Sequence, residues 1–245
     1  MGTPHAWVWT RWLSPRPNGD KMDKISIRDA ATIVVLRDAR TTPSVLMGQR
    51  GASAAFMPGK FVFPGGAVDP VDAQVPVTLP QTEAARLAQD SARAPASLAA
   101  AAIRELWEET GHILGQRAEW ADAPKGWRGF AASGHQPNGS ALQFLFRAIT
   151  PPGRPRRFDA RFFLADADAL TTDLDDFSNA EDELAHLQWV PLHQARKFDL
   201  PFITQVVLAE LNAQIASGER AATVPFFRNN DEARLVSRLG GKPLL

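Results

Sequence analysis

The chain has 245 residues, 44% of them hydrophobic and 22% charged, and its 27 basic and 27 acidic side chains give a formal net charge of zero. This length suits one large domain or one domain with an added helical lobe, and zero net charge gives no general means of gathering nucleic acid or an anionic membrane. Cysteine is absent, which excludes disulfides, cysteine nucleophiles and cysteine-based zinc sites.

Residues 1–24 are predicted to form an N-terminal extension. They contain Trp7, Trp9 and Trp12 but no continuous apolar core of the kind found in a secretory signal. A transit peptide is the alternative, because no acidic residue precedes Asp20. The longest apolar stretches of the chain, such as residues 98–103, are too short to span a bilayer. We therefore expect a cytoplasmic protein that does not enter a membrane.

Residues 25–200 carry the strand-like segments. The β-branched run at residues 31–36 predicts a buried strand, residues 44–49 its hairpin partner, and residues 61–63 a short strand that ends at Pro64-Gly65-Gly66. Further strands are expected at residues 142–149, 157–165 and 184–190, whereas residues 115–139 are expected to form a loop. Strands in bursts around one strong helix indicate a mixed α/β layer fold.

Two helices are predicted with defined ends. Residues 98–110 form a strongly helical run with Ser97 as N-cap and Gly111 as C-terminal cap. Residues 73–96 have the character of an insertion, with a helix allowed at residues 82–93. Residues 201–245 are expected to be a C-terminal helical segment, in which an amphipathic helix over 201–216 places these side chains on one core-facing stripe: Phe202, Val206, Leu208, Ala209 and Leu211.

Three carboxylates share one face of the predicted central helix. Glu105, Glu108 and Glu109 are related by three and four positions, so they project together within about one turn. Alone, this pattern fits a solvated acidic face. The glycine pair Gly65-Gly66, however, ends a strand upstream and could bring a main-chain carbonyl beside the carboxylates. Such an all-oxygen site suits Mg²⁺ or Mn²⁺ better than zinc.

These segments resemble a known family signature. Phe63-Pro64-Gly65-Gly66 followed by Arg104-Glu105-Leu106-Trp107-Glu108-Glu109-Thr110-Gly111 is similar to the Nudix box of the Nudix hydrolases. Residues 73–96 lie inside the box as an insertion, Asp72 stands where the box has glutamate, and His112 stands where it has an aliphatic residue, as a partly exposed cap. The resemblance implies a Nudix α/β/α sandwich with a mixed β-sheet and the added C-terminal helical segment.

The resemblance also implies roles for the metal site. Glu105 and Glu109 would be the main ligands of Mg²⁺ or Mn²⁺, Glu108 would complete the cluster, and Gly65 would offer its main-chain carbonyl. Arg104 cannot bind a cation, and we expect it to hold a neighbouring glutamate through a bidentate pair.

The base that takes the proton from water is expected to be either Glu105 or a residue of the acidic loop before Trp189. Glu183 lies six residues before Trp189, a spacing that resembles the family's extra glutamate, so we expect it to be a further metal ligand or the base. Glu181 could substitute, and a merely solubilising acidic loop is the alternative.

The insertion in the box, together with residues 56–66 and 155–163, resembles the coenzyme A diphosphatase branch. Arg50 matches a coenzyme A signature, but Ala55 stands where a second arginine is expected. Phe63 is a further candidate for substrate binding. Arg157 and Arg161 share one face of a predicted strand and could meet substrate phosphates, with nonspecific surface charge as the alternative.

The predicted reaction is attack of water on phosphorus in a nucleoside diphosphate linked to another group, with coenzyme A or an acyl-coenzyme A as the first-choice substrate. ADP-ribose, NAD(H) and dinucleoside polyphosphates remain open, and so does a non-catalytic Nudix metabolite sensor. Messenger-RNA decapping is disfavoured by the absence of a basic surface. The expected partner is a small nucleotide, and the oligomeric state, a homodimer included, is left open.

Overall fold

The computed structural model describes residues 26–228, 236–238 and 242–243. The predicted N-terminal extension, residues 1–24, lies outside this range. The main sheet runs in the order β12-β11-β10-β7-β8-β1-β2-β3, with β4 also paired to β1 and β9 to β2. Its strands are β1 (Ile27–Arg37), β2 (Ser44–Arg50), β3 (Phe61–Val62), β4 (Gly65–Ala67), β7 (Gln143–Ile149), β8 (Arg157–Asp166), β9 (Leu184–Pro191), β10 (Pro225–Phe227), β11 (Val236–Arg238) and β12 (Lys242–Pro243).

The sheet is mixed, as predicted. β1 pairs in parallel with β8 and antiparallel with β2 and β4. Alternate side chains of β1 enter two different cores: Ile33 and Val35 belong to one hydrophobic cluster, and Val34 and Leu36 to the other. A strand buried on both faces in this way reads as a continuous apolar run, which is why residues 31–36 were recognisable in the sequence.

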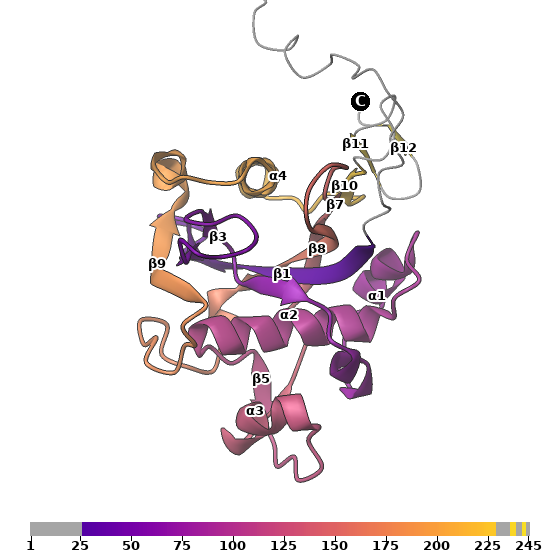
Figure 1. The fold of residues 1–245 in the computed structure, drawn as a ribbon, viewed down its shortest axis with the longest axis vertical. Helices are drawn as coiled ribbons and strands as arrows, with labels where there is room; N and C mark the ends of the chain where they lie inside the picture. The colour runs from indigo at the N-terminus through magenta and orange to yellow at the C-terminus, as the bar shows by residue number, and fades with distance from the viewer. Residues whose placement is uncertain (1–25, 229–235, 239–241, 244–245) are drawn as a thin grey trace, which may run out of the picture.

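One helix covers each face of the sheet (Figure 1). α2 (Pro95–Thr110) packs on the face that holds Ile33, and α4 (Phe202–Ser217) on the face that holds Val34. The predicted α/β/α sandwich is therefore confirmed. The other helical elements outside residues 115–139 are η1 (Pro70–Gln74), α1 (Gln81–Ala88), η3 (Ala167–Ala169) and η4 (Leu192–Lys197). None of the described helices is long and apolar enough to cross a membrane.

Residues 115–139 are not the loop that the sequence predicted. They form β5 (Gly115–Arg117), η2 (Lys125–Trp127), α3 (Arg128–Ala132) and β6 (His135–Pro137), with β5 and β6 paired as a separate two-stranded sheet. This lobe packs on α2 through aromatic rings: Phe130 lies 5.3 Å from Trp127 and 5.9 Å from Trp107 of α2, measured between ring centroids. The burial of these rings orders a segment whose glycines and alanines suggested irregular structure.

The predicted helical segment over residues 201–245 is helical only as far as Ser217, because β10, β11 and β12 follow it and join the main sheet. One predicted helix end and one predicted helix face are also wrong, and one predicted end is confirmed. α2 begins at Pro95, two residues before the predicted N-cap Ser97, because proline at the first helical position already fits the helix. The predicted cap Gly111 is confirmed by its left-handed φ of 78°. On α4, Phe202 is 66% exposed and Ala209 is also exposed, so neither belongs to the core-facing stripe. Its buried side chains are Thr204, Val207, Leu208 and Leu211.

Candidate active site

The glycine pair of β4 lies directly against the carboxylates of α2. A Cβ atom at Gly65 would stand 2.6 Å from Oγ1 of Thr32, and one at Gly66 would stand 2.6 Å from Cδ of Glu105. The atoms close to Gly65 include backbone atoms of β1, the carbonyl oxygen of Ala31 and Cα of Thr32, both at 2.7 Å, so glycine is required there for the close approach of β4 to β1. At Gly66 the carboxylate of Glu105 occupies the space that a Cβ atom would take. The main-chain N–H of Gly65 donates a hydrogen bond to Oε2 of Glu109 at 2.7 Å. The structure thus brings together the glycines and two of the predicted ligands. The hydrogen bond is made by the N–H of Gly65, whereas the predicted metal ligand is its carbonyl oxygen.

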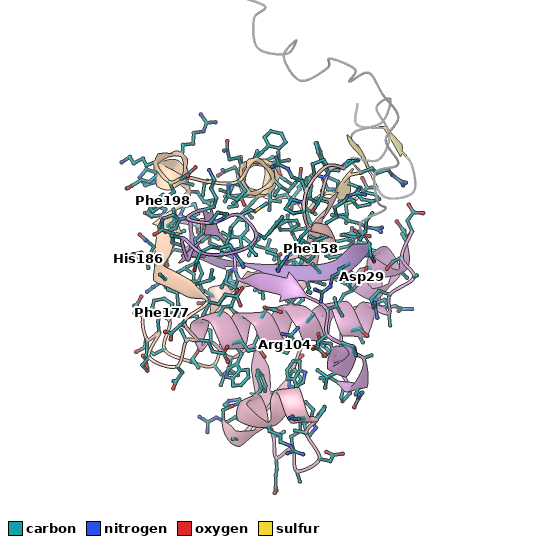
Figure 2. The ribbon with its side chains drawn as sticks, in the orientation of Figure 1. Asp29, Arg104, Phe158, Phe177, His186 and Phe198 are labelled. Atoms are coloured by element: carbon teal, nitrogen blue, oxygen red, sulfur yellow. The ribbon has the colours of Figure 1, made fainter. Side chains whose placement is uncertain are left out.

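Arg104 of α2, labelled in Figure 2, is hydrogen-bonded to three acidic side chains. It is held by Asp72 through two bonds, Nε to Oδ1 at 2.9 Å and Nη2 to Oδ2 at 3.1 Å. Its Nη1 donates to Glu105 Oε1 at 2.9 Å and to Glu108 Oε2 at 2.8 Å. The bidentate partner is therefore the fully buried Asp72 and not the predicted glutamate. The one sequence signal for this pairing is the position of Asp72 in the box.

The loop before β9 also reaches the cluster. The main-chain N–H of Glu181 donates to the carbonyl of Glu108 at 2.8 Å. Burial raises the pKa of both Glu105 and Glu109, and the charge of Glu183 raises both pKa values further. Glu183 itself pairs with Arg50, whose Nη2 lies 2.9 Å from Oε1. The structure therefore brings Glu183 close enough to act on Glu105 and Glu109, and Arg50 close enough to act on Glu109.

We define the carboxylate cluster as Asp72, Glu105, Glu108 and Glu109 around Arg104. Burial and, against the opposing effect of Arg104, the charge of Glu108 raise the pKa of Glu105 to about 7. Burial and the charge of Glu105 raise the pKa of Glu109 well above its ordinary range, and burial also raises the pKa of Glu108. One guanidinium does not neutralise four carboxylates, so the cluster has more acidic groups than positive charges.

A divalent cation fits this need. Glu109 is 2% exposed, and its Oε1 has no hydrogen-bond partner among the described residues, whereas a buried carboxylate oxygen normally has one. Carboxylate oxygens are hard ligands suited to Mg²⁺ or Mn²⁺. Within the part of the chain that the structure describes, no three acidic or histidine side chains already surround one point. Because Arg104 holds Glu105 and Glu108, these two side chains would have to turn toward a bound ion.

Three residues predicted to bind substrate make their contacts with residues outside the carboxylate cluster. Arg161 is 2% exposed and its Nη1 pairs with Asp29 at 2.6 Å, so it is neither a surface charge nor an open phosphate site. Arg157 donates from Nε to the carbonyl of Thr150 at 2.9 Å. Phe63 is 3% exposed and packs in the core beneath α4. Burial and pairing of this kind leave no periodic trace in the sequence.

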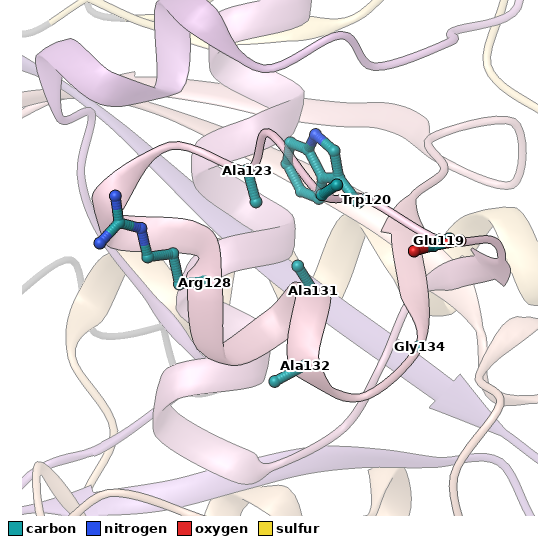
Figure 3. A pocket seen from close by; sticks show the side chains of 8 residues that line it. Glu119, Trp120, Ala123, Arg128, Ala131, Ala132 and Gly134 are labelled. Carbon is teal, nitrogen blue, oxygen red and sulfur yellow. The ribbon is translucent and has the colours of Figure 1, made fainter.

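His112 is fully buried, which corrects the prediction of a partly exposed cap. A separate cavity of about 450 Å³ lies on the lobe formed by residues 115–139 (Figure 3). Its lining residues include Trp120, Arg128 and Ala131, and none of them belongs to the carboxylate cluster.

Comparisons with known proteins match the described fold. The family model for the NUDIX domain matches residues 27–211. A Caenorhabditis elegans protein named nudix hydrolase 7 is 30% identical over 178 residues, which cover 67% of this chain and 52% of that protein, so the chain spans about half the length of that relative. The crystal structure of a NUDIX hydrolase from Alicyclobacillus acidocaldarius is 28% identical, with a TM-score of 0.60 over 79% of this chain and 97% of that one. The match to the family model covers most of the chain, including both glycines and all three glutamates of α2, and the chain belongs to the Nudix hydrolase family.

Proposed function

We propose that this protein hydrolyses the pyrophosphate linkage of a nucleoside diphosphate joined to another group, with water attacking phosphorus. The observation that carries the proposal is the carboxylate cluster, which is buried, short of positive charge and set against the glycine pair of β4. A merely solvated acidic face, the alternative reading of the sequence, would leave these side chains in water. Members of the Nudix hydrolase family act on small nucleotides and generally use divalent cations.

Glu105, Glu108 and Glu109 would hold the cation, with Glu183 and the main-chain carbonyl of Gly65 as further ligands. Bound Mg²⁺ or Mn²⁺ would neutralise the pyrophosphate oxygens and make a bound water more acidic. The side chains of the protein would position the ligands and accept the proton from water. Arg104 orients Glu105 and Glu108 through the hydrogen bonds it donates to them.

Proton transfer from water needs a base near neutral pH. Burial raises the pKa of Glu105 to about 7 in the metal-free protein. A bound cation would favour the ionised form of this carboxylate, and an ionised carboxylate beside the water can take its proton. Glu183 is the alternative base, because it is more exposed and its side chain reaches the cluster from the opposite element. Replacing each by glutamine separates the two. The base must be deprotonated to act, so loss of the acidic limb of the kcat profile identifies it.

Coenzyme A or an acyl-coenzyme A is the first candidate substrate, on the resemblance carried by residues 56–66 and by Arg50. The Nε of Arg50 is buried and has no hydrogen-bond partner within the described ranges, so the described residues do not supply the partner that a buried donor normally has. Arg157 is partly buried and still has donors beyond its bond to Thr150. ADP-ribose, NAD(H) and dinucleoside polyphosphates are the other candidates, because the cluster would recognise the pyrophosphate they share.

The test is a screen of the purified protein with Mg²⁺ or Mn²⁺ against these compounds, with products identified by mass. Coenzyme A should yield 3′,5′-ADP and a 4′-phosphopantetheine product, and ¹⁸O from water should enter a phosphate group. Turnover should stop in excess chelator and return with the metal. Turnover that persists in chelator would exclude the proposed chemistry. Equal rates with and without the 3′-phosphate of coenzyme A, in wild type and in Arg157→Ala, would exclude Arg157 from substrate binding.

A further inference from the structure

The segment that carries Glu183 is hydrogen-bonded to the C-terminal end of α2. We define the acidic loop as residues 170–183, between η3 and β9. The main-chain N–H of Thr171 donates to the carbonyl of Ile113 at 3.0 Å, and that of Glu181 donates to the carbonyl of Glu108 at 2.8 Å. Between these bonds the loop passes Gly111, where an added Cβ would stand 3.0 Å from Cβ of Asn179. The loop therefore follows the C-terminal end of α2 over several contacts.

His112 is enclosed by this loop and by β9. Its Nδ1 lies 3.1 Å from Oγ1 of Thr172, and its ring centroid lies 5.2 Å from that of Phe177 and 6.4 Å from that of Trp189. The indole N–H of Trp189 donates to the loop carbonyl of Leu174 at 2.9 Å. Figure 2 labels Phe177 on the segment that precedes β9, beside the end of α2. The imidazole is thus a buried contact between the end of α2 and the acidic loop.

This residue is a departure of the chain from its family's signature, which has an aliphatic residue at the position of His112. An aliphatic side chain could fill the same space but could not bond to Thr172. Thr172 Oγ1 also accepts the main-chain N–H of Ile113 at 3.4 Å. The polar contact therefore fixes one register between the start of the loop and the end of α2.

We propose that His112 is a positioning residue that holds the acidic loop in register with α2 and so sets the place of Glu183 beside Glu105 and Glu109. The proposal rests on the proposed function of Glu183 as a ligand of the divalent cation. Groups that orient a ligand without touching the ion typically change metal affinity by about 10- to 100-fold when removed. The effect of losing His112 should therefore fall on the metal requirement.

The experiment compares His112→Leu, which restores the aliphatic residue of the family, with Thr172→Val and with the double variant. We expect each single variant to raise the Mg²⁺ concentration for half-maximal activity by about tenfold, with the substrate KM at saturating Mg²⁺ unchanged. The double variant should be no worse than either single one, because both remove the same bond. His112→Asn can still bond to Thr172 and should recover most of the wild-type Mg²⁺ requirement.

Arg37→Gln is the matched control. It breaks the more exposed pair between Arg37 and Asp175, 2.7 Å apart, at another point of the acidic loop, and should leave the Mg²⁺ requirement within twofold. A His112→Leu protein with a lower Tm but the wild-type Mg²⁺ requirement would overturn the proposal, because His112 would then only stabilise the fold. If wild type shows no metal-dependent turnover, the proposed function fails. Mn²⁺ affinity measured by electron paramagnetic resonance then decides the inference, and equal affinities in wild type and His112→Leu would refute it.

Discussion

Two of the groups of charged side chains that are buried among the described residues differ in charge balance. Arg104 of one group and Asp29 of the other are labelled in Figure 2. One is the carboxylate cluster, with four acids around Arg104. The other, here called the arginine network, joins Arg147 and Arg161 of β7 and β8 to two aspartates, Asp29 and Asp159. Arg147 binds Asp159 through two bonds of 2.9 and 2.7 Å. In the arginine network two cations face two acids, and Asp159 is shared between Arg147 and Arg161.

This comparison shows that surplus charge, and not burial alone, distinguishes a candidate site from a structural ion pair. Among the described residues, the side chains of the arginine network have no unpartnered buried nitrogen or oxygen, whereas Oε1 of Glu109 has no partner. Pairing of buried charges offsets the cost of removing them from water. The carboxylate cluster lacks that compensation, so it is the place where a cation would bind most favourably.

The largest effect is expected in the arginine network. Arg161→Met would remove the cation that Asp29 and Asp159 share, while Arg93 stays beside Asp29 and Arg147 beside Asp159. We therefore expect a loss of unfolding free energy at the lower end of the cost of breaking a buried pair, which is about 3–5 kcal/mol. Urea denaturation measures this loss, and kcat of the folded enzyme should not change. Arg154→Met, at an exposed arginine, is the control and should stay within about 0.5 kcal/mol. A large fall in kcat with intact stability would instead place Arg161 at the substrate.

Glu109→Gln should lower kcat and leave stability intact, the reverse of Arg161→Met. It keeps the side-chain size and an acceptor for the N–H of Gly65 but removes the charge that would hold the cation. A loss of about 3 kcal/mol of transition-state stabilisation lowers kcat roughly 100-fold. The Tm in chelator should be unchanged or higher, because one of several mutually repelling carboxylates is gone, and added Mg²⁺ should stabilise the variant less than wild type. Near-normal kcat would mean that these carboxylates have no catalytic role. Glu119→Gln, outside the cluster, is the control.

Asp72→Asn should affect stability and activity together. The asparagine side chain would keep one hydrogen bond to Arg104 but lose the charge of a fully buried partner, at a cost of about 2 kcal/mol in unfolding free energy. The guanidinium of Arg104 would then bind Glu105 and Glu108 more strongly and hold them away from a metal ion. We therefore expect kcat to fall about tenfold at low Mg²⁺, roughly 1.4 kcal/mol, and to recover at high Mg²⁺. A kcat deficit that Mg²⁺ does not reduce would contradict this role.

Local pattern was enough to predict single elements and a mixed α/β layer fold, whereas the α/β/α sandwich was implied by the resemblance to the Nudix box. The apolar run of β1, the glycine pair and the spacing of Glu105, Glu108 and Glu109 each follow from geometry within one element. The fate of Arg161 could not be predicted in this way, because its partner Asp29 is 132 positions away. The packing of Trp127 and Phe130 on Trp107 likewise depends on contacts between elements, so residues 115–139 were predicted as loop.

The smallest effect is the pH dependence of stability, which also distinguishes the two charged groups. The pKa of Glu105 is about 7 in the folded protein, against an ordinary value of 4.5. Between these values the folded state retains a proton that the unfolded chain has released. The free energy of unfolding in chelator should therefore fall as pH rises from about 4.5 to 7, by at most about 1.4 kcal/mol per pH unit for one group.

Burial lowers the pKa of His112, which works in the opposite direction, because the unfolded chain then binds the extra proton and stability rises with pH. The difference between wild type and Glu105→Gln cancels the contribution of His112 and leaves that of Glu105, together with the effect of its charge on the pKa of Glu109. We expect that difference, measured by urea denaturation at several pH values between 5 and 8, to change by about 1 kcal/mol per pH unit below pH 7 and to level off above it. Arg161→Met should leave this difference unchanged, because the ion pairs of Arg161 are with Asp29 and Asp159 and not with the carboxylate cluster. A slope that is the same in wild type and Glu105→Gln would show that Glu105 is already ionised at pH 5. The positive charge near the carboxylate cluster would then be enough to stabilise its ionised form, as it is in the arginine network.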